Sequence, residues 1–291
     1  MANRKAREFL TAAGFLLPNI TGFLLFTLAP ILFSLGMSFF DWDLFSVPVF
    51  VDLANFGRML SPASHISGYL GNTLFFLIIV PLQMCFGLAT ALLLNERLKG
   101  SLLFKAIFFV PVVLSVVPVA IVWEYLLDTE HGLLNGMLVA VGAGKVAWLY
   151  DPFWIKAGIS MMAVWQGSAF GTIIYYAALQ GIPDQLYEVS ALDGAGWWPK
   201  FRRITLPLLA PAHLFLGVTG IIGALQLFAP IMVMTHGNAG GAHNLIFEVY
   251  VKAYQEFQMG YASALAWSLF FVMFILSAAY GVYAAERSRY A

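Results

Sequence analysis

Residues 181–207 read GIPDQLYEVSALDGAGWWPKFRRITLP, a polar stretch that lies between two long apolar runs. Pro183 early in this stretch suits the first turn of a helix. An apolar face at helical spacing follows, made of Leu186, Val189 and Leu192. Gly194 stands where this helix should stop, because glycine readily adopts the left-handed conformation that ends many helices. The stretch therefore predicts a short helix, a sharp turn and a second helix, exposed between two spans as a handle for a partner.

Six apolar runs surround this stretch, and each is long enough to cross the roughly 30 Å core of a bilayer as a helix. They cover residues 15–39, 70–94, 103–127, 155–179, 206–232 and 261–285. The chain has 61% hydrophobic and only 10% charged residues, whereas soluble domains carry about 25% charge. The sequence therefore predicts an all-α polytopic membrane protein, a single transmembrane domain over residues 1–291, with a cytoplasmic loop at about 181–205 between the fourth and fifth spans.

Positive charges gather on one side of these runs. Eleven of the fifteen Lys and Arg residues lie in the N-terminal tail, in the connections after the second and fourth runs, and at the C-terminus. Cytoplasmic loops of membrane proteins carry such an excess. We therefore expect both termini in the cytoplasm, which agrees with an even number of spans.

The remaining residues form no recognisable catalytic or metal-binding pattern. The net charge is zero, so no basic surface indicates nucleic acid. The five histidines lack metal-site spacing with acidic partners, and no Ser/His/Asp or Cys/His arrangement stands out. Residues 142–145 lack the first glycine of a phosphate loop, and Val146 occupies its Ser/Thr position. We predict no catalytic residue, no metal and no cofactor in this chain.

Polar side chains inside apolar runs are costly in lipid, so they mark substrate paths or contacts between helices. Aromatic faces combined with amide or carboxylate partners can bind a polar solute. The predicted substrate path consists of such residues: Asn72, Glu124, Trp165, Gln166, Tyr175, Gln226 and Phe228. Gln83 and Ser168 are further candidates of the same kind. For any one of these residues the alternative interpretation is a hydrogen bond between helices, worth about 0.6 kcal/mol.

The 181–207 stretch resembles a known family. Glu188, Gly194 and the Ile204-x-Leu206-Pro207 ending match the Glu-Ala-Ala-x3-Gly-x9-Ile-x-Leu-Pro loop of binding-protein-dependent ABC importer permeases. The two alanines of that signature are Val189 and Ser190 here. Segments elsewhere resemble the carbohydrate-uptake permeases of the maltose and glycerol-phosphate type: residues 16–19, 38–42, 55–56, 226–228, 235–237 and 260–264.

This resemblance implies a type I ABC importer permease fold, in which the Glu188–Pro207 loop lies in a groove of a cytoplasmic ATPase subunit. The residues it assigns to ATPase coupling are Glu188, Val189, Ser190, Ala191, Leu192, Asp193, Gly194, Ala195, Ile204 and Pro207. It implies half of a translocation pathway for a sugar or polyol, in the inner membrane of a bacterium or archaeon. The implied partners are a second permease subunit, two ATPase subunits that bind ATP and Mg, and an extracytoplasmic substrate-binding protein.

Two other classes of function remain open from the residues. An ion-coupled secondary transporter works alone and usually carries more intramembrane carboxylates, for which Glu124 is the main candidate. An intramembrane enzyme needs a catalytic pair at membrane depth, and none is visible. Because the apolar runs offer essentially no cations, the sequence favours a neutral sugar over a phosphate-bearing one.

Overall fold

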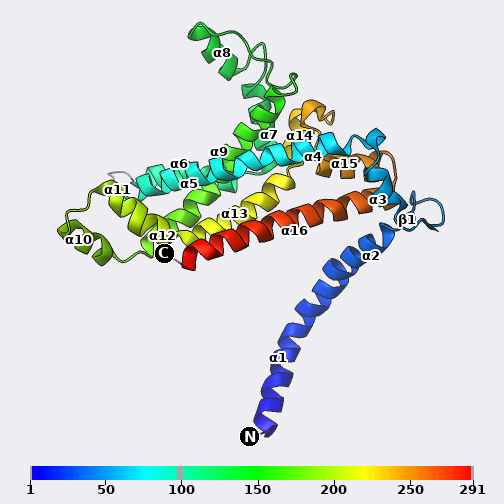
Figure 1. Cartoon of the computed structure of the whole chain (residues 1–291), viewed down its shortest axis with the longest axis horizontal. Coiled ribbons are helices and arrows are strands. Elements are labelled where there is room, and N and C mark those ends of the chain that lie inside the picture. Colours follow the sequence, from blue (N-terminus) through cyan, green and yellow to red (C-terminus); the bar gives the residue numbers. More distant parts are fainter. Residues whose placement is uncertain (1, 97–100, 290–291) are drawn as a thin grey trace. The chain divides into compact units, whose positions relative to one another are not determined.

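The computed structural model describes residues 2–96 and 101–289, and nearly all elements in these ranges are helices (Figure 1). Arg97 and Lys99, which belong to the predicted cytoplasmic charges, lie outside the described residues. The chain, predicted as a single domain, divides into two compact units. One consists of Met1–His65 with Glu248–Ser268, and the other of Ile66–Phe247 with Leu269–Ala291.

The first unit contains the N-terminal helices and a two-stranded antiparallel sheet that pairs Phe40 with Phe50. Its elements are α1 (Ala2–Phe23), η1 (Leu24–Leu28), α2 (Ala29–Met37), β1 (Phe40–Asp41), β2 (Val49–Phe50), α3 (Ala54–Met59), η2 (Pro62–Ser64), η6 (Val251–Gln255) and the start of α16 (Met259–Arg289). Asn55 is buried and donates to the carbonyls of Ser38 at 3.0 Å and Phe40 at 2.9 Å. This amide therefore holds the loop after the first span against the strand.

The second unit holds the helices around which the rest of the molecule is organised. They are α4 (Ile66–Phe75), η3 (Phe76–Ile78), α5 (Ile79–Asn95), α6 (Ser101–Val113), α7 (Val116–Leu126), α8 (Leu133–Ala140), α9 (Trp154–Gln180), α10 (Asp184–Leu192), α11 (Trp197–Lys200), η4 (Phe201–Thr205), α12 (Leu206–Leu208), α13 (Ala210–Leu225), α14 (Ala229–Met234) and η5 (Gly240–Ala242). Helix α15 (Leu245–Tyr250) crosses from the second unit into the first, and the end of α16 returns to the second.

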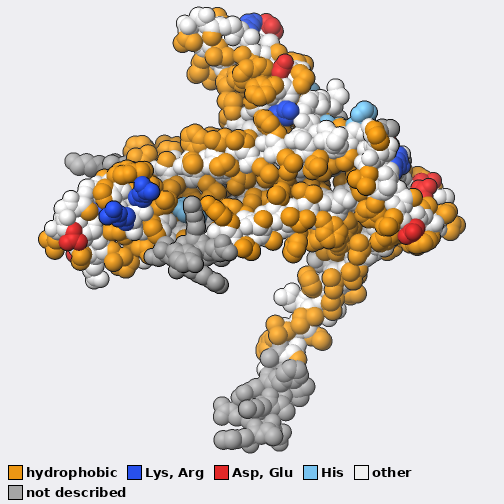
Figure 2. Space-filling model, viewed as in Figure 1, with side chains coloured by type: hydrophobic (Ala, Val, Ile, Leu, Met, Phe, Trp, Pro, Cys, Tyr) orange, Lys and Arg blue, Asp and Glu red, His pale blue; other side chains and the backbone are white. Residues whose placement is uncertain are grey.

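Within the described residues, five stretches of helix are long and apolar enough to cross a membrane. They are Ala13–Met37, Ile66–Asn95, Trp154–Gln180, Ala210–Met234 and Met259–Ala284, and they confirm the first, second, fourth, fifth and sixth predicted spans to within a few residues. Hydrophobic side chains cover much of the described surface of the long helices in this view (Figure 2). Phe15 and Phe26 are more than four-fifths exposed. Such a surface suits lipid and not water.

The third predicted span is not one straight helix. Helices α6 and α7 meet at an angle of 103°, and Ser115 between them is extended. A continuous helix would need an N–H at position 118 to bond the carbonyl of Leu114, but Pro118 has none and its ring clashes with that carbonyl. The frequent prolines of the spans, read from the sequence as ordinary packing, therefore include one that breaks a helix.

Helices α5 and α9 pack closely because glycines meet at their contact. A Cβ on Gly87 would lie 2.9 Å from the carbonyl carbon of Gly171 and 3.0 Å from the nitrogen of Thr172. Gly171 belongs to the small-xxx-small step with Gly167 that predicts a close approach. Further along α9, Tyr175 lies with Leu209 in a buried cluster to which α5, α9 and α13 contribute.

We expect Gly87→Val to destabilise the protein by about 1–3 kcal/mol, because overpacking forces the two backbones apart. Thermal unfolding in detergent measures the loss as a lower midpoint. The matched control is Gly71→Val on α4, since a Cβ at Gly71 meets nothing within 4 Å. Equal midpoints for the two variants would show that the α5–α9 contact does not depend on glycine.

Candidate functional site

The loop between the fourth and fifth spans forms the predicted helix–turn–helix. Helix α10 begins at Asp184 directly after Pro183, which is extended. The turn is closed by Ala195, whose N–H donates to the carbonyl of Ser190 at 3.0 Å. Gly194 has a φ of +76°, the left-handed conformation predicted for it. The chain then continues through α11 and η4 into the fifth span. Residues 183–205 are called the bracket below.

One face of α10 is exposed and combines two polar with two apolar residues. Gln185, Glu188, Val189 and Leu192 are all exposed, and they share this face by helical spacing. Val189 is 59% exposed and Leu192 is 89% exposed. Lys and Arg side chains gather near α11 beside this face (Figure 2). With Leu186, which is also exposed, Val189 and Leu192 form an apolar patch on a polar loop, and such a patch indicates a surface that a partner covers.

The inner face of the bracket is anchored to the spans. The hydroxyls of Tyr187 on α10 and Thr205 at the end of η4 are hydrogen-bonded at 2.9 Å. Tyr187 and Ile204 pack against the buried cluster around Leu209. The hydroxyl of Ser190 is buried without a hydrogen-bond partner. Of the residues assigned to coupling, Ser190 and Ile204 therefore face the chain itself, whereas Glu188, Val189 and Leu192 face outward.

The fifth span is interrupted between the end of α13 at Leu225 and the start of α14 at Ala229. A cavity of about 480 Å³ lies among α5, α9, α13, this interruption and the start of α7. Its polar side chains are Gln83, Gln166, Thr219 and Gln226, and its aromatic side chains are Phe170 and Phe228. None of the described residues that line it carries a charge. Uncharged amides beside aromatic faces suit a neutral, hydroxyl-rich ligand. Gln166, Gln226 and Phe228, three of the seven predicted substrate-path residues, meet in this cavity.

The other four predicted path residues lie elsewhere. Asn72 donates to the carbonyl of His243 at 2.8 Å and accepts from Lys156 at 3.1 Å. Oε1 of Glu124 lies 3.0 Å from Nε2 of the exposed His236. Trp165 borders a separate apolar cavity. Tyr175 is buried with its hydroxyl 2.7 Å from Nδ1 of His213. None of the four lines the 480 Å³ cavity, because each polar group finds a partner or a packing site at another depth or face.

Gln83 and Thr219 line the cavity, although Gln83 was only a secondary candidate and Thr219 was not one. Gln83 fits between two glycines: a Cβ on Gly167 would overlap its Oε1, and one on Gly220 would lie 2.7 Å from its Nε2. The sequence offers only a weak signal for this contact: an amide in the second span and glycines in the fourth and fifth spans. That signal has no fixed spacing, since it depends on three helices being brought together.

Residues 83–285 match the family described as binding-protein-dependent transport system inner membrane component. The chain belongs to this family. It is therefore a multi-pass inner-membrane transport component, and the bracket lies inside the matched region. The fold is that of the ABC importer permeases to which its solved structural neighbours belong.

Two relatives match this transport component over most of their length. It is 33% identical over 278 residues to the probable ABC transporter permease protein YesP of Bacillus subtilis, covering 93% of this chain and 89% of the relative. It is also 33% identical over 264 residues to the trehalose/maltose transport system permease protein MalF of Thermococcus litoralis, covering 90% and 89%.

Solved structures of a bacterial alginate transporter have the same fold. One chain of that ABC transporter, which is involved in the import of the acidic polysaccharide alginate, matches with a TM-score of 0.80 and 26% identity, covering 99% of this chain and 97% of that one. A second structure, of the transporter in complex with an alginate pentasaccharide-bound periplasmic protein, also matches with a TM-score of 0.80, at 24% identity.

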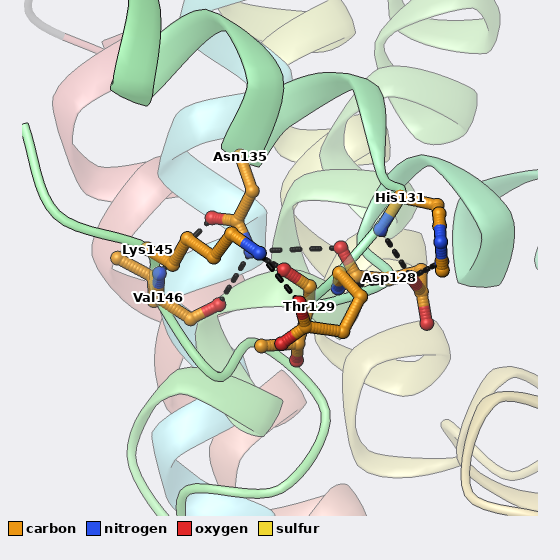
Figure 3. A network of polar contacts seen from close by, with 7 residues as sticks. Asp128, Thr129, His131, Asn135, Lys145 and Val146 are labelled. Carbon is orange, nitrogen blue, oxygen red and sulfur yellow. Dashed lines mark hydrogen bonds and ion pairs between the residues drawn. The ribbon is translucent and has the colours of Figure 1, made fainter.

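In the transport component, residues 128–148 form a loop with one short helix between the third and fourth spans, called the excursion below, and hydrogen bonds hold it together (Figure 3). Asn135 on α8 is buried; its amide donates to the carbonyls of Thr129 at 3.0 Å and Val146 at 2.9 Å. Its oxygen accepts from the N–H of Val146 and from the indole of Trp148. The backbone N–H of His131 holds the pKa of the neighbouring Asp128 carboxyl below its ordinary value. One amide thus closes residues 128–148 into a fixed shape.

We expect Asn135→Ala to destabilise this excursion by about 2–3 kcal/mol, because several buried polar groups lose their partners. Hydrogen exchange of residues 129–148 should rise by about 30- to 150-fold, the same free energy expressed as a ratio. Lys145→Ala is the control, since its pair with Glu130 is exposed and worth about 0–1 kcal/mol. Unchanged exchange in Asn135→Ala would contradict the role of this side chain.

Proposed function

We propose that this chain is one permease subunit of an ABC importer for a neutral sugar or polyol. It contributes half of the translocation pathway, and its bracket couples the pathway to a cytoplasmic ATPase. The proposed complex contains a second permease subunit, two ATPase subunits and an extracytoplasmic sugar-binding protein. ATP and Mg bind the ATPase subunits, and this chain has no catalytic site of its own.

The observation that carries the coupling role is the outward apolar face of α10. Leu192 is 89% exposed on a loop that also presents Glu188, and the hydrogen bond between Tyr187 and Thr205 joins α10 to η4, which leads into the fifth span. A partner that covers Val189 and Leu192 gains their apolar burial. A force applied to α10 then passes to α13 through η4 as a rigid-body movement.

The cavity supports the proposed class of substrate. It offers three glutamine amides, a threonine hydroxyl and two phenylalanine rings, without a charged side chain among its described lining residues. A carboxylate or phosphate taken into such a site would lose its hydration without gaining a cation. A neutral sugar instead exchanges water for amides and stacks on the rings. The trehalose/maltose relative transports a substrate of this chemistry, as its name states.

The proposed orientation places both termini and the bracket in the cytoplasm. Eleven of the fifteen Lys and Arg residues lie on that side, as the excess of positive charge on cytoplasmic loops requires. The Asn135 excursion and the Glu124–His236 pair then lie on the outer side, where a sugar-binding protein docks. A cysteine-accessibility assay at Val141, which is 80% exposed, tests this orientation with a membrane-impermeant reagent.

Purification from the native membrane in mild detergent, followed by mass spectrometry of what co-purifies, tests the complex. We expect a second permease and an ATPase to co-purify with the wild-type chain. The ATPase should no longer co-purify with the Glu188→Arg variant. Reconstitution into proteoliposomes with radiolabelled maltose, trehalose and lactose then tests the substrate class. Transport by this chain alone without ATP would instead establish an ion-coupled carrier, which the uncharged cavity lining disfavours.

A further inference from the structure

Gln166 lies where the cavity meets the break in the third span. Its side-chain Nε2 donates to the carbonyl oxygen of Leu114 at 3.0 Å. This is the carbonyl that Pro118 excludes from a continuous helix. Gln166 and Val116, the first residue of α7, both line the cavity. One side-chain amide on α9 therefore contacts both the helix break and the space in which a substrate would lie.

The break needs a partner for that carbonyl. A backbone carbonyl that a helix break leaves free needs a side-chain or water partner at membrane depth, and a fixed side-chain donor holds it in one direction as water does not. Ser115, the residue before α7, forms no capping hydrogen bond with its side chain. The bond from Gln166 ties the turn between α6 and α7 to α9, which packs against α6. The direction in which α7 leaves the break thus depends on a residue 52 positions away in the sequence.

The interruption in the fifth span is held differently. The carbonyl of Leu227 accepts from Nδ2 of Asn244 at 2.8 Å, and Oδ1 of Asn244 accepts from the N–H of Phe247 at 3.0 Å. Asn244 is completely buried, so both of its polar atoms are committed to the protein. Gln166 is only half-buried and lines the cavity, and only its Nε2 is committed to the bond with Leu114.

We propose that Gln166 is the positioning residue of the third span, setting the angle between α6 and α7 through the Leu114 carbonyl. A sugar hydroxyl that donates to Oε1 holds the amide in this position, so cavity occupancy and the break are coupled through one side chain. This second step rests on the proposed sugar transport. Helix α7 packs against α14, and the Glu124–His236 pair joins their outer ends. Fixing α7 therefore also fixes the outer half of the fifth span.

Spin-label distances test the positioning role without any sugar. The labels replace Ile107 on α6 and Val122 on α7, both more than half exposed. The background is Cys85→Ala, which removes the only cysteine. The full chain is measured in lipid nanodiscs with the partners that co-purify. We expect one narrow distance distribution for the parent and for Gln226→Met, and a broad one for Gln166→Met. An equally narrow distribution in Gln166→Met would overturn the proposal.

Uptake kinetics of maltose, trehalose and lactose provide the second test. Gln166→Glu keeps an oxygen acceptor but loses the donor to Leu114, and Gln226→Glu makes the same change in the same cavity. For the transported sugar we expect Gln166→Glu to lower the maximal rate at least about tenfold, beyond any change in KM; Gln226→Glu should mainly raise KM. Identical profiles for both variants would reduce Gln166 to an ordinary sugar ligand.

The two tests separate this inference from the proposed function. The wild type could take up none of the three sugars while Gln166→Met still broadens the distance distribution. That result would contradict the sugar assignment and the coupling to cavity occupancy, and it would support the positioning role. If uptake is normal and the distances do not respond, the importer assignment stands and the positioning role falls. Gln166→Asn adds a check, because its shorter side chain should not reach the Leu114 carbonyl and should behave as Gln166→Met.

Discussion

Leu192→Asp should abolish sugar uptake and the recovery of the ATPase with this chain, while the protein still inserts and folds. Leu192 is 89% exposed, so a carboxylate there costs the isolated chain little. In the proposed complex the leucine would be buried, and its loss would remove about 1.5–3 kcal/mol of apolar transfer free energy. A charged group left without a partner in the groove adds a further penalty. We expect the affinity for the ATPase to fall by at least about 100-fold, which corresponds to about 2.7 kcal/mol.

The control is the same type of substitution on an equally exposed apolar residue away from the bracket. Val141 directly follows α8 and is 80% exposed. Val141→Asp should therefore leave ATPase recovery unchanged. Glu188→Ala should have a smaller effect than Leu192→Asp, because exposed ion pairs contribute only about 0–1 kcal/mol. Full ATPase recovery with a well-folded Leu192→Asp variant would place the docking surface somewhere other than α10.

Gly223→Phe should block transport while preserving the fold and the bound ATPase. Gly223 on α13 lines the cavity, and a Cβ built on it meets nothing within 4 Å. A phenyl ring can therefore extend into the space that the substrate needs without displacing a helix. We expect uptake to fall by at least about 100-fold, equivalent to about 2.7 kcal/mol. The free energy of unfolding should change by no more than about 0.5 kcal/mol, because no packed contact is disturbed.

Gly223→Ser provides the graded control, since its small side chain leaves most of the cavity of about 480 Å³ open. It should retain most of the uptake rate at the same protein level. Melting curves and ATPase recovery for both variants distinguish a blocked pathway from a misfolded protein. Wild-type uptake by a well-folded Gly223→Phe variant would mean that the solute does not pass through this cavity.

The bracket and five of the six spans were predictable because local properties determine them. An apolar run of sufficient length forms a helix in lipid, where every backbone polar group must be paired within its own segment. Pro183 marks the start of α10, and Gly194 takes the left-handed conformation that ends it. The outward direction of Val189 and Leu192 then follows from helical periodicity. None of these features requires knowledge of which helices are neighbours.

The candidate substrate site was only partly predictable for the opposite reason. Intramembrane amides and aromatic residues could be recognised as a class of candidates. Asn72 instead pairs with Lys156, and Tyr175 pairs with His213. Of the predicted set, only Gln166, Gln226 and Phe228 line the cavity. The polar and aromatic residues that converge there come from α5, α9, α13 and the break between α13 and α14. Their sequence separations carry no periodic signal.

The sequence by itself determined that the chain spans a membrane and which residues form most of its spans. It also determined that a polar bracket exposes an apolar face suited to a partner. Only the tertiary structure decided that the third span breaks at Leu114 and that its freed carbonyl is taken by Gln166. A proline such as Pro118 can kink a helix, end it or be tolerated within it. The outcome depends on which donor the rest of the fold brings to the excluded carbonyl, and that donor lies on another helix.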